Sequence, residues 1–164
     1  MSALERHHAG WVIVLSFLVA ALLTVLPLPD WMEPYRPEWL VLFLIYWIMA
    51  LPYRIGMLSG WIIGFFEDVL EGSLLGLNAL ALAIVAYIAM SLYRRLRMFT
   101  PFQQSCTVMV IVGLHQLLSY WILTASNQAV APDLLFLASA VSSAFFWPLV
   151  FVALRQSRRY FRVI

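Results

Sequence analysis

Two adjacent carboxylates, Glu67 and Asp68, stand inside an otherwise apolar stretch. A carboxylate near a bilayer is costly unless it faces water, protein or the interface, so this position suggests a function. Neighbouring residues on a helix point about 100° apart, however, which is a poor arrangement for a general acid and base acting on one substrate. Two interpretations stay open: the acids, with Glu71 after them, mark a helix end, or they contact a partner or ligand.

The other polar side chains form no catalytic pattern. His115 and Ser119 lie four residues apart, on one face of a helix, where an interhelical hydrogen bond is the ordinary role. A single cysteine, Cys106, excludes an intramolecular disulfide and a metal site built from several cysteines. The chain has no phosphate-binding glycine loop, zinc-protease helix or nucleophile elbow. We therefore expect a protein that is not an enzyme and carries no cofactor or metal.

A stripe of small or acidic residues surrounds the acidic pair. One occurs at every fourth position, at Gly56, Gly60, Gly64, Asp68, Gly72 and Gly76. Helical residues four apart lie one above another, so the first part of this stripe is a face that another backbone can approach closely. Packing within the protein is the favoured interpretation because the helix is short; the alternative is that a partner's membrane helix docks there.

The elements that position these residues are membrane helices. The chain is 64% apolar and 11% charged, with a mean hydropathy of +0.91, which does not describe a soluble domain of 164 residues. We predict an all-α integral membrane protein, a compact bundle of six transmembrane helices in one domain, 1–164. Its six apolar runs are about 10–27, 38–51, 55–70, 77–92, 105–125 and 133–154. Some of these runs fall short of the roughly 20 residues that cross a bilayer. The run 38–51 must therefore be extended by its flanks, thin the bilayer locally or be shielded by neighbouring helices, and short buried runs suggest a compact bundle.

The arginines set the orientation. All ten basic residues are arginine, and six spans would put nine of them on one side: Arg6, Arg54, Arg94, Arg95, Arg97, Arg155, Arg158, Arg159 and Arg162. Seven of the eight acids gather toward the opposite side: Asp30, Glu33, Glu38, Glu67, Asp68, Glu71 and Asp133, leaving Glu5. Cytoplasmic loops carry the excess of basic residues, so we expect both termini in the cytoplasm.

Arg36 is the one arginine on the outer side, in a first loop that is stiffened by four prolines. The segment from Arg36 to Trp39 starts the second run, so one interpretation is a helix start with Glu38 in its first turn and Trp39 as an aromatic anchor. The other interpretation is that Arg36 pairs with Glu67, Asp68 or Glu71, or binds an anionic group.

The basic side offers contacts of its own. Six arginines lie in the connector after the fourth run and in the tail: Arg94, Arg95, Arg97, Arg155, Arg158 and Arg159. Such clusters bind anionic lipid or cytoplasmic proteins. Ordinary topological anchoring explains them equally well.

The order of these features resembles the rod shape-determining MreD family of Gram-negative bacteria, over nearly the whole chain. The resemblance lies in Arg36-Pro37-Glu38-Trp39, Tyr46-Trp47, Leu51-Pro52-Tyr53-Arg54-Ile55-Gly56, Gly64, the segment from Asp68 to Gly76, and Arg94-Arg95-Leu96-Arg97-Met98-Phe99. It implies a non-enzymatic inner-membrane scaffold of the elongasome, which carries out peptidoglycan synthesis in the lateral wall. The implied direct partner is MreC. The implied complex also holds MreB, RodZ, RodA and the transpeptidase that partners RodA. Membrane lipids are expected partners, nucleic acid is not, and a homodimer is left open.

The family's six-helix fold is similar to the S-components of energy-coupling-factor (ECF) vitamin transporters. That similarity implies a second hypothesis, a binding module that holds a small ligand or lipid-linked intermediate. Its outward-facing pocket would lie beneath the first loop, near Arg36, Glu38, Trp39 and the acidic pair. The small-residue contact typical of the first S-component helix is missing, because Thr24 follows Ala20 four residues later, which speaks against transport coupling.

Overall fold

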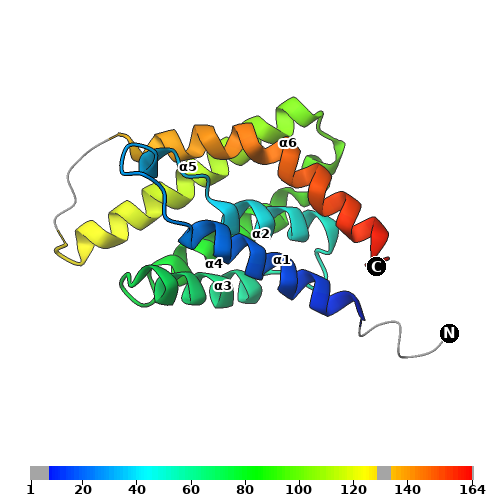
Figure 1. Cartoon of the computed structure of the whole chain (residues 1–164), viewed down its shortest axis with the longest axis horizontal. Helices are drawn as coiled ribbons and strands as arrows, with labels where there is room; N and C mark the ends of the chain where they lie inside the picture. The colour runs from blue at the N-terminus through cyan, green and yellow to red at the C-terminus, as the bar shows by residue number, and fades with distance from the viewer. Residues whose placement is uncertain (1–7, 129–133, 164) are drawn as a thin grey trace.

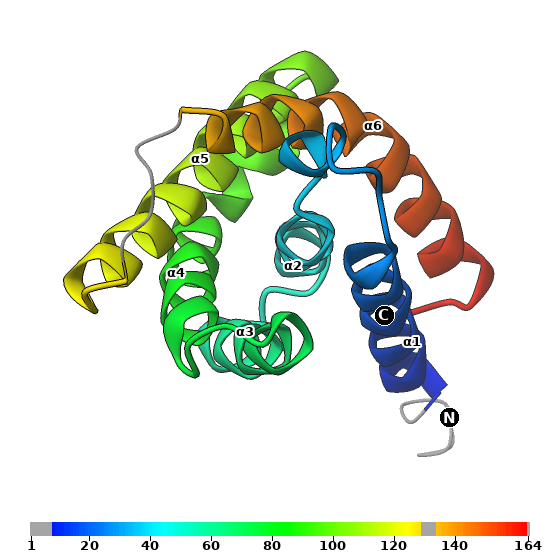
Figure 2. The same ribbon diagram turned by 60° about the vertical axis from the view of Figure 1, so that its left-hand side comes forward.

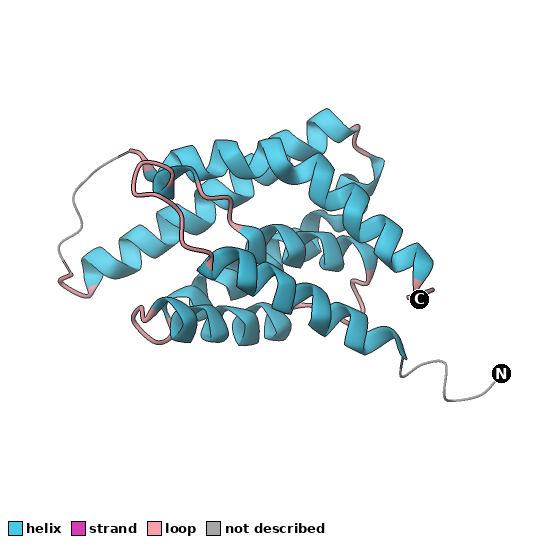
Figure 3. Ribbon diagram, in the orientation of Figure 1, coloured by secondary structure: helices cyan, strands magenta, loops and turns pink. Residues whose placement is uncertain are grey.

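Six α-helices form from the six apolar runs in the computed structural model, which describes residues 8–128 and 134–163 (Figure 1). They are α1 (His8–Val25), α2 (Trp39–Ala50), α3 (Met57–Glu71), α4 (Leu77–Met98), α5 (Pro101–Ala125) and α6 (Phe136–Tyr160), with one 3-10 turn, η1 (Glu33–Tyr35), in the first loop. These described ranges contain no strand (Figure 3). Glu5, Arg6 and Asp133, which entered the orientation argument, lie outside the described residues.

Two helices extend beyond their predicted ends. We expected α4 and α6 to end near residues 92 and 154, where arginines begin, but they continue to Met98 and Tyr160. Arginine is a good helix former, and a cation in the last turn interacts favourably with the helix dipole. The basic connector and tail are therefore helical ends rather than loops.

Among the described residues, three helices are long and apolar enough to cross a membrane: Leu77–Met98, Pro101–Ala125 and Leu137–Tyr160. The apolar part of α1, Gly10–Val25, is shorter. At 1.5 Å per residue, α2 and α3 are only roughly 18 and 22 Å long, less than a hydrocarbon core of about 30 Å. The chain is thus a helical membrane protein whose second and third helices need neighbours.

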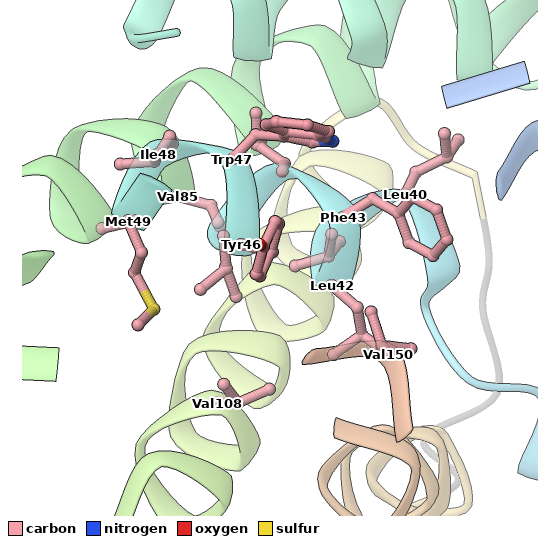
Figure 4. Packing of buried hydrophobic residues seen from close by; sticks show 14 of the residues in the cluster. Leu40, Leu42, Phe43, Tyr46, Trp47, Ile48, Met49, Val85, Val108 and Val150 are labelled. Atoms are coloured by element: carbon pink, nitrogen blue, oxygen red, sulfur yellow. The ribbon is translucent and has the colours of Figure 1, made fainter. Parts of the chain in front are cut away.

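Helix α2 lies in the middle of the bundle, with the other five helices around it (Figure 2). Every residue from Leu40 to Met49 is buried. A helix that is apolar on all sides is stable only where other protein or lipid surrounds it, and here the side chains of α4, α5 and α6 pack against it (Figure 4). This packing explains how so short an apolar helix is accommodated.

Successive helices run in opposite directions, which gives the bundle two chemically different ends (Figure 1). At the end that we call the arginine end lie the start of α1, the α2–α3 and α4–α5 turns and the end of α6. At the opposite end, the loop end, lie the first loop, the α3–α4 turn and the end of α5. Of the described charged residues, every acid and Arg36 belong to the loop end, and the other arginines belong to the arginine end.

The glycine stripe brings α3 against α4. A Cβ added to Gly60 would lie 2.7 Å from the Leu82 carbonyl oxygen, and one added to Gly64 would overlap the Asn78 carbonyl oxygen. At the N-cap of α3, a Cβ on Gly56 would meet only the Met90 side chain, at 3.1 Å. Gly60 and Gly64 thus serve packing within the bundle. The alternative prediction, that a partner's membrane helix docks on these two glycines, is wrong because the backbone of α4 already occupies that face.

Candidate functional site at the loop end

Asp68 caps the start of α4. Its Oδ1 accepts hydrogen bonds from Ser73 Oγ (2.8 Å) and the backbone amide of Asn78 (3.0 Å). Its Oδ2 accepts from the backbone amides of Gly76 (2.9 Å) and Ala79 (3.4 Å). The first amides of a helix have no partner within the helix, and its N-terminus favours a negative charge. The carboxylate, 1% exposed, is therefore satisfied by the turn that follows it.

Arg36 plays the opposite part at the end of α1. Its guanidinium donates to the carbonyl oxygens of Thr24 (Nη1, 2.6 Å) and Leu26 (Nη2, 2.8 Å). These carbonyls lie where α1 ends, and a helix C-terminus favours a cation. Arg36 thus binds the first loop to α1. The expectation that it pairs with Glu67, Asp68 or Glu71 has no hydrogen bond to support it in the described residues.

Helix α6 holds the other side of the first loop. Ser139 Oγ donates to the Arg36 carbonyl oxygen (2.7 Å), and the Glu38 amide donates to Ser143 Oγ (2.9 Å). Glu38 lies at the N-cap of α2, and its Oε1 accepts from Gln116 Nε2 of α5 (2.8 Å). The loop is therefore attached to α1, α5 and α6 at once.

Several buried polar atoms near this loop have no hydrogen-bond partner. They are Arg36 Nε, Glu67 Oε2, Gln116 Oε1 and both ring nitrogens of His115. Glu67 and His115 are only 2% and 3% exposed. A buried polar group without a partner costs free energy, and of these residues Arg36 and Gln116 line a cavity in which a bound polar molecule would supply partners.

A cleft opens beside Arg36 and Gln116. One part, about 230 Å³, is lined by residues that include Arg36, Glu38, Glu71, Gln116 and Ser139; an adjoining part of about 430 Å³ also reaches Arg36 and Glu71. The lining combines one guanidinium with several carboxylates. Such a cleft can receive a ligand that has both an anionic group and a cationic or hydrogen-bonding group. No group of three metal-ligating side chains lies together in the described part of the chain.

Not all predicted site residues join this cleft. Arg36, Glu38 and Glu71 line it, whereas Asp68 is used by the α3–α4 turn and the Trp39 ring packs on Phe146, with centroids 5.5 Å apart. Thr24, Gln116, Ser139 and Ser143 were not predicted as site residues. The four-residue spacing of Ser139 and Ser143 on one helical face was a usable signal. Gln116 gave none, because its partner Glu38 lies 78 residues away.

Of the six predicted basic contacts at the arginine end, Arg97 and Arg94 interact with other groups of the chain. Arg97 donates to the last carbonyls of α2, at Met49 (2.7 Å) and Ala50 (3.2 Å), so it caps a helix. The guanidinium of Arg94 lies over the Tyr93 ring, 5.7 Å from its centroid. The remaining predicted contacts have surface-accessible side chains: Arg95, Arg155, Arg158 and Arg159.

These features define a class: a helical membrane protein with a polar cleft at one end and a basic surface at the other. Within that class, the sequence profile described as rod shape-determining protein MreD matches residues 5–157. A protein of Haemophilus influenzae named rod shape-determining protein MreD is 33% identical over 155 residues, which cover 94% of this chain and 95% of that protein. The chain therefore belongs to the MreD family. No solved structure gives a significant match to it.

Proposed function

We propose that this chain is a non-enzymatic scaffold of the cell-wall elongation machinery and acts by binding MreC. Its family membership supports a role in determining rod shape. Through MreC it would be linked to MreB, RodZ, RodA and the partner transpeptidase. We further propose an inner-membrane, multi-pass topology of six spans with both termini in the cytoplasm. The gathering of the described arginines other than Arg36 at the arginine end of the bundle supports that orientation, because cytoplasmic segments carry the excess of basic residues.

The observation that carries the MreC proposal is the outer face of α3. Trp61 and Phe65 stack there with ring centroids 5.8 Å apart, and Phe66 beside them is 63% exposed. Because α3 has only 15 residues, lipid alone would have to thin around it. A membrane helix of MreC packed on these rings would cover the short helix and bury large aromatic side chains, which dominate interface energies.

Replacing Trp61 and Phe65 together by alanine is expected to reduce co-purification with MreC in mild detergent about tenfold or more, because buried aromatic anchors each contribute 2 kcal/mol or more, roughly, at interfaces. The matched control is the pair Phe145 and Leu149 on α6, which are 80% and 64% exposed. The control should keep MreC. Equal retention by both double variants, each with an unchanged melting temperature, would contradict the proposed interface.

A second function is favoured by the unpartnered groups at the loop end. We propose as the alternative that the cleft holds a small polar ligand or a lipid-linked intermediate, in a fold similar to the ECF S-components. Arg36 Nε and Gln116 Oε1, whose residues line the cleft, would then gain partners. Native mass spectrometry of the purified chain should reveal a retained molecule that is lost in Glu38→Gln. If both the parent chain and the variant have the mass of the protein alone, with no retained molecule, this alternative is contradicted.

A further inference from the structure

The arginine end contains a pocket that the scaffold role does not use. It has a volume of about 370 Å³ and lies between the ends of α2, α4 and α6, with α5 contributing one residue. The polar part of its lining consists of Arg97, Arg155, Arg158, Tyr46 and Gln104. No carboxylate lines it, and the nearest acids in the described sequence belong to the loop end. The pocket is therefore strongly cationic.

The three guanidinium groups differ in their freedom. Two nitrogens of Arg97 are fixed on the carbonyls of α2, which positions its remaining donors beside the pocket. Arg155 and Arg158, one turn apart on α6, have no hydrogen-bond or ion-pair partner within the described residues. Unpaired arginines that converge on one pocket suit the oxygens of a phosphate group, which guanidinium binds with two parallel hydrogen bonds.

One lining residue of this pocket, Gln104, has its side chain fixed by hydrogen bonds. Gln104 is buried, its Nε2 donates to the Leu96 carbonyl oxygen (2.9 Å), and its Oε1 accepts from Trp147 Nε1 (3.3 Å). Both ends of this amide are thus occupied, and it joins α4, α5 and α6. A lining residue that is already held in place lowers the cost of ordering the site when a ligand binds.

The surroundings of the pocket indicate a lipid as the source of the phosphate. Phe145, Leu149 and Val152 are exposed at helical spacing along α6, and Arg155 follows one turn later. The pocket wall itself includes Phe151 and Met49. A lipid whose headgroup lies among the arginines can therefore lay an acyl chain along this apolar stripe, as anionic lipids do at basic pockets between membrane helices.

We propose that the pocket formed by Arg97, Arg155 and Arg158 binds the phosphate headgroup of an anionic membrane phospholipid. The site is distinct from the loop-end cleft and does not depend on which protein partner binds α3. Its effect would be to fix the end of α6 against α2 and α4 in membranes that contain anionic lipid.

The test uses the full chain in neutral phosphatidylcholine nanodiscs, titrated with phosphatidylglycerol and read by native mass spectrometry. Replacing Arg155 and Arg158 together by glutamine should weaken lipid binding about tenfold or more, since the loss of one arginine near an anionic lipid weakens binding roughly fivefold and two are lost here. The control pair Arg94 and Arg95, replaced in the same way, removes equal charge outside the pocket and should change binding less than about twofold.

Equal weakening in both pairs would overturn the proposal, because it would reflect general surface charge. Should the glutamine pair fail to fold, Arg155→Lys with Arg158→Lys keeps the charge but loses the two-pronged donor, and unchanged binding in that variant would also overturn it. Millimolar inorganic phosphate added in detergent should not displace the lipid. Displacement by free phosphate would show that the site takes the free ion and would overturn the lipid assignment.

Discussion

Replacing Gly64 by alanine is expected to produce the largest loss of stability of any glycine-to-alanine substitution in this chain. The added Cβ would overlap the Asn78 carbonyl oxygen and lie 2.6 Å from both the Cα and the amide nitrogen of Ala79. These are backbone atoms, which cannot rotate away as a side chain can, so α3 and α4 must separate. Overpacking usually costs about 1–3 kcal/mol and occasionally more, and we expect a value at or above the upper end.

The measurement is the thermal unfolding of both proteins in the same detergent. Gly113→Ala is the matched control, because its Cβ would meet Ala140 Cβ at 3.9 Å, an ordinary van der Waals contact. In a helix interior, alanine is favoured over glycine by about 1 kcal/mol, so this variant should be as stable as the parent chain or more so. A melting temperature of Gly64→Ala equal to that of Gly113→Ala would show that α3 and α4 are not in the described contact.

The helices themselves were predictable because burial in a bilayer or among other helices requires long apolar runs, and charged residues interrupt them. The same rule misplaced the ends of α4 and α6, where arginine-rich turns stay helical. The run of α2 was informative because it is apolar on every side and too short to span alone, which left extension by its flanks, a locally thinned bilayer or shielding by neighbouring helices, and the structure shows the shielding. Its position at the centre of the bundle (Figure 2) was not predicted, because the apolar pattern does not say which neighbours cover it.

The loop-end site was only partly predictable. The sequence left two interpretations of Glu67 and Asp68 open, a helix end or contacts with a partner or ligand. The hydrogen-bond donors to Asp68 lie within the following 11 residues, in a turn marked by Gly72 and Gly76. Both glycines have positive φ, 65° and 99°, as such a turn requires. The contacts of Glu38 join residues 78 and 105 positions apart. No local pattern encodes such distances, which depend on how the helices pack.

Three charged side chains among the described residues cap the end or start of a neighbouring helix. Arg36 caps the end of α1, Arg97 caps the end of α2, and Asp68 caps the start of α4. Each charge has the sign that the helix dipole favours. Short helices gain most from such caps, because unsatisfied terminal groups are a larger fraction of their backbone. Charges that looked like candidates for partner binding therefore also hold the bundle together.

Replacing Asp68 by alanine is expected to cause a loss of stability second only to that of Gly64→Ala among the variants proposed for this chain. The change leaves the amides of Gly76, Asn78 and Ala79 and the Ser73 hydroxyl without their acceptor. Loss of a helix cap costs about 0.5–2 kcal/mol, and a buried donor without a partner costs about 1–3 kcal/mol. We expect a combined loss of about 2–4 kcal/mol and more rapid amide hydrogen exchange at the start of α4.

Glu67→Gln is the matched control for Asp68→Ala. Glu67 is the adjacent residue and is equally buried, but its Oε2 has no hydrogen-bond partner. Glutamine removes the cost of burying a charge and keeps the shape of the side chain, so its stability should match or exceed that of the parent chain. The comparison separates a specific cap from general acidity. If Asp68→Ala unfolds at the same temperature as Glu67→Gln, with unchanged hydrogen exchange from Leu77 onward, then Asp68 does not hold the start of α4.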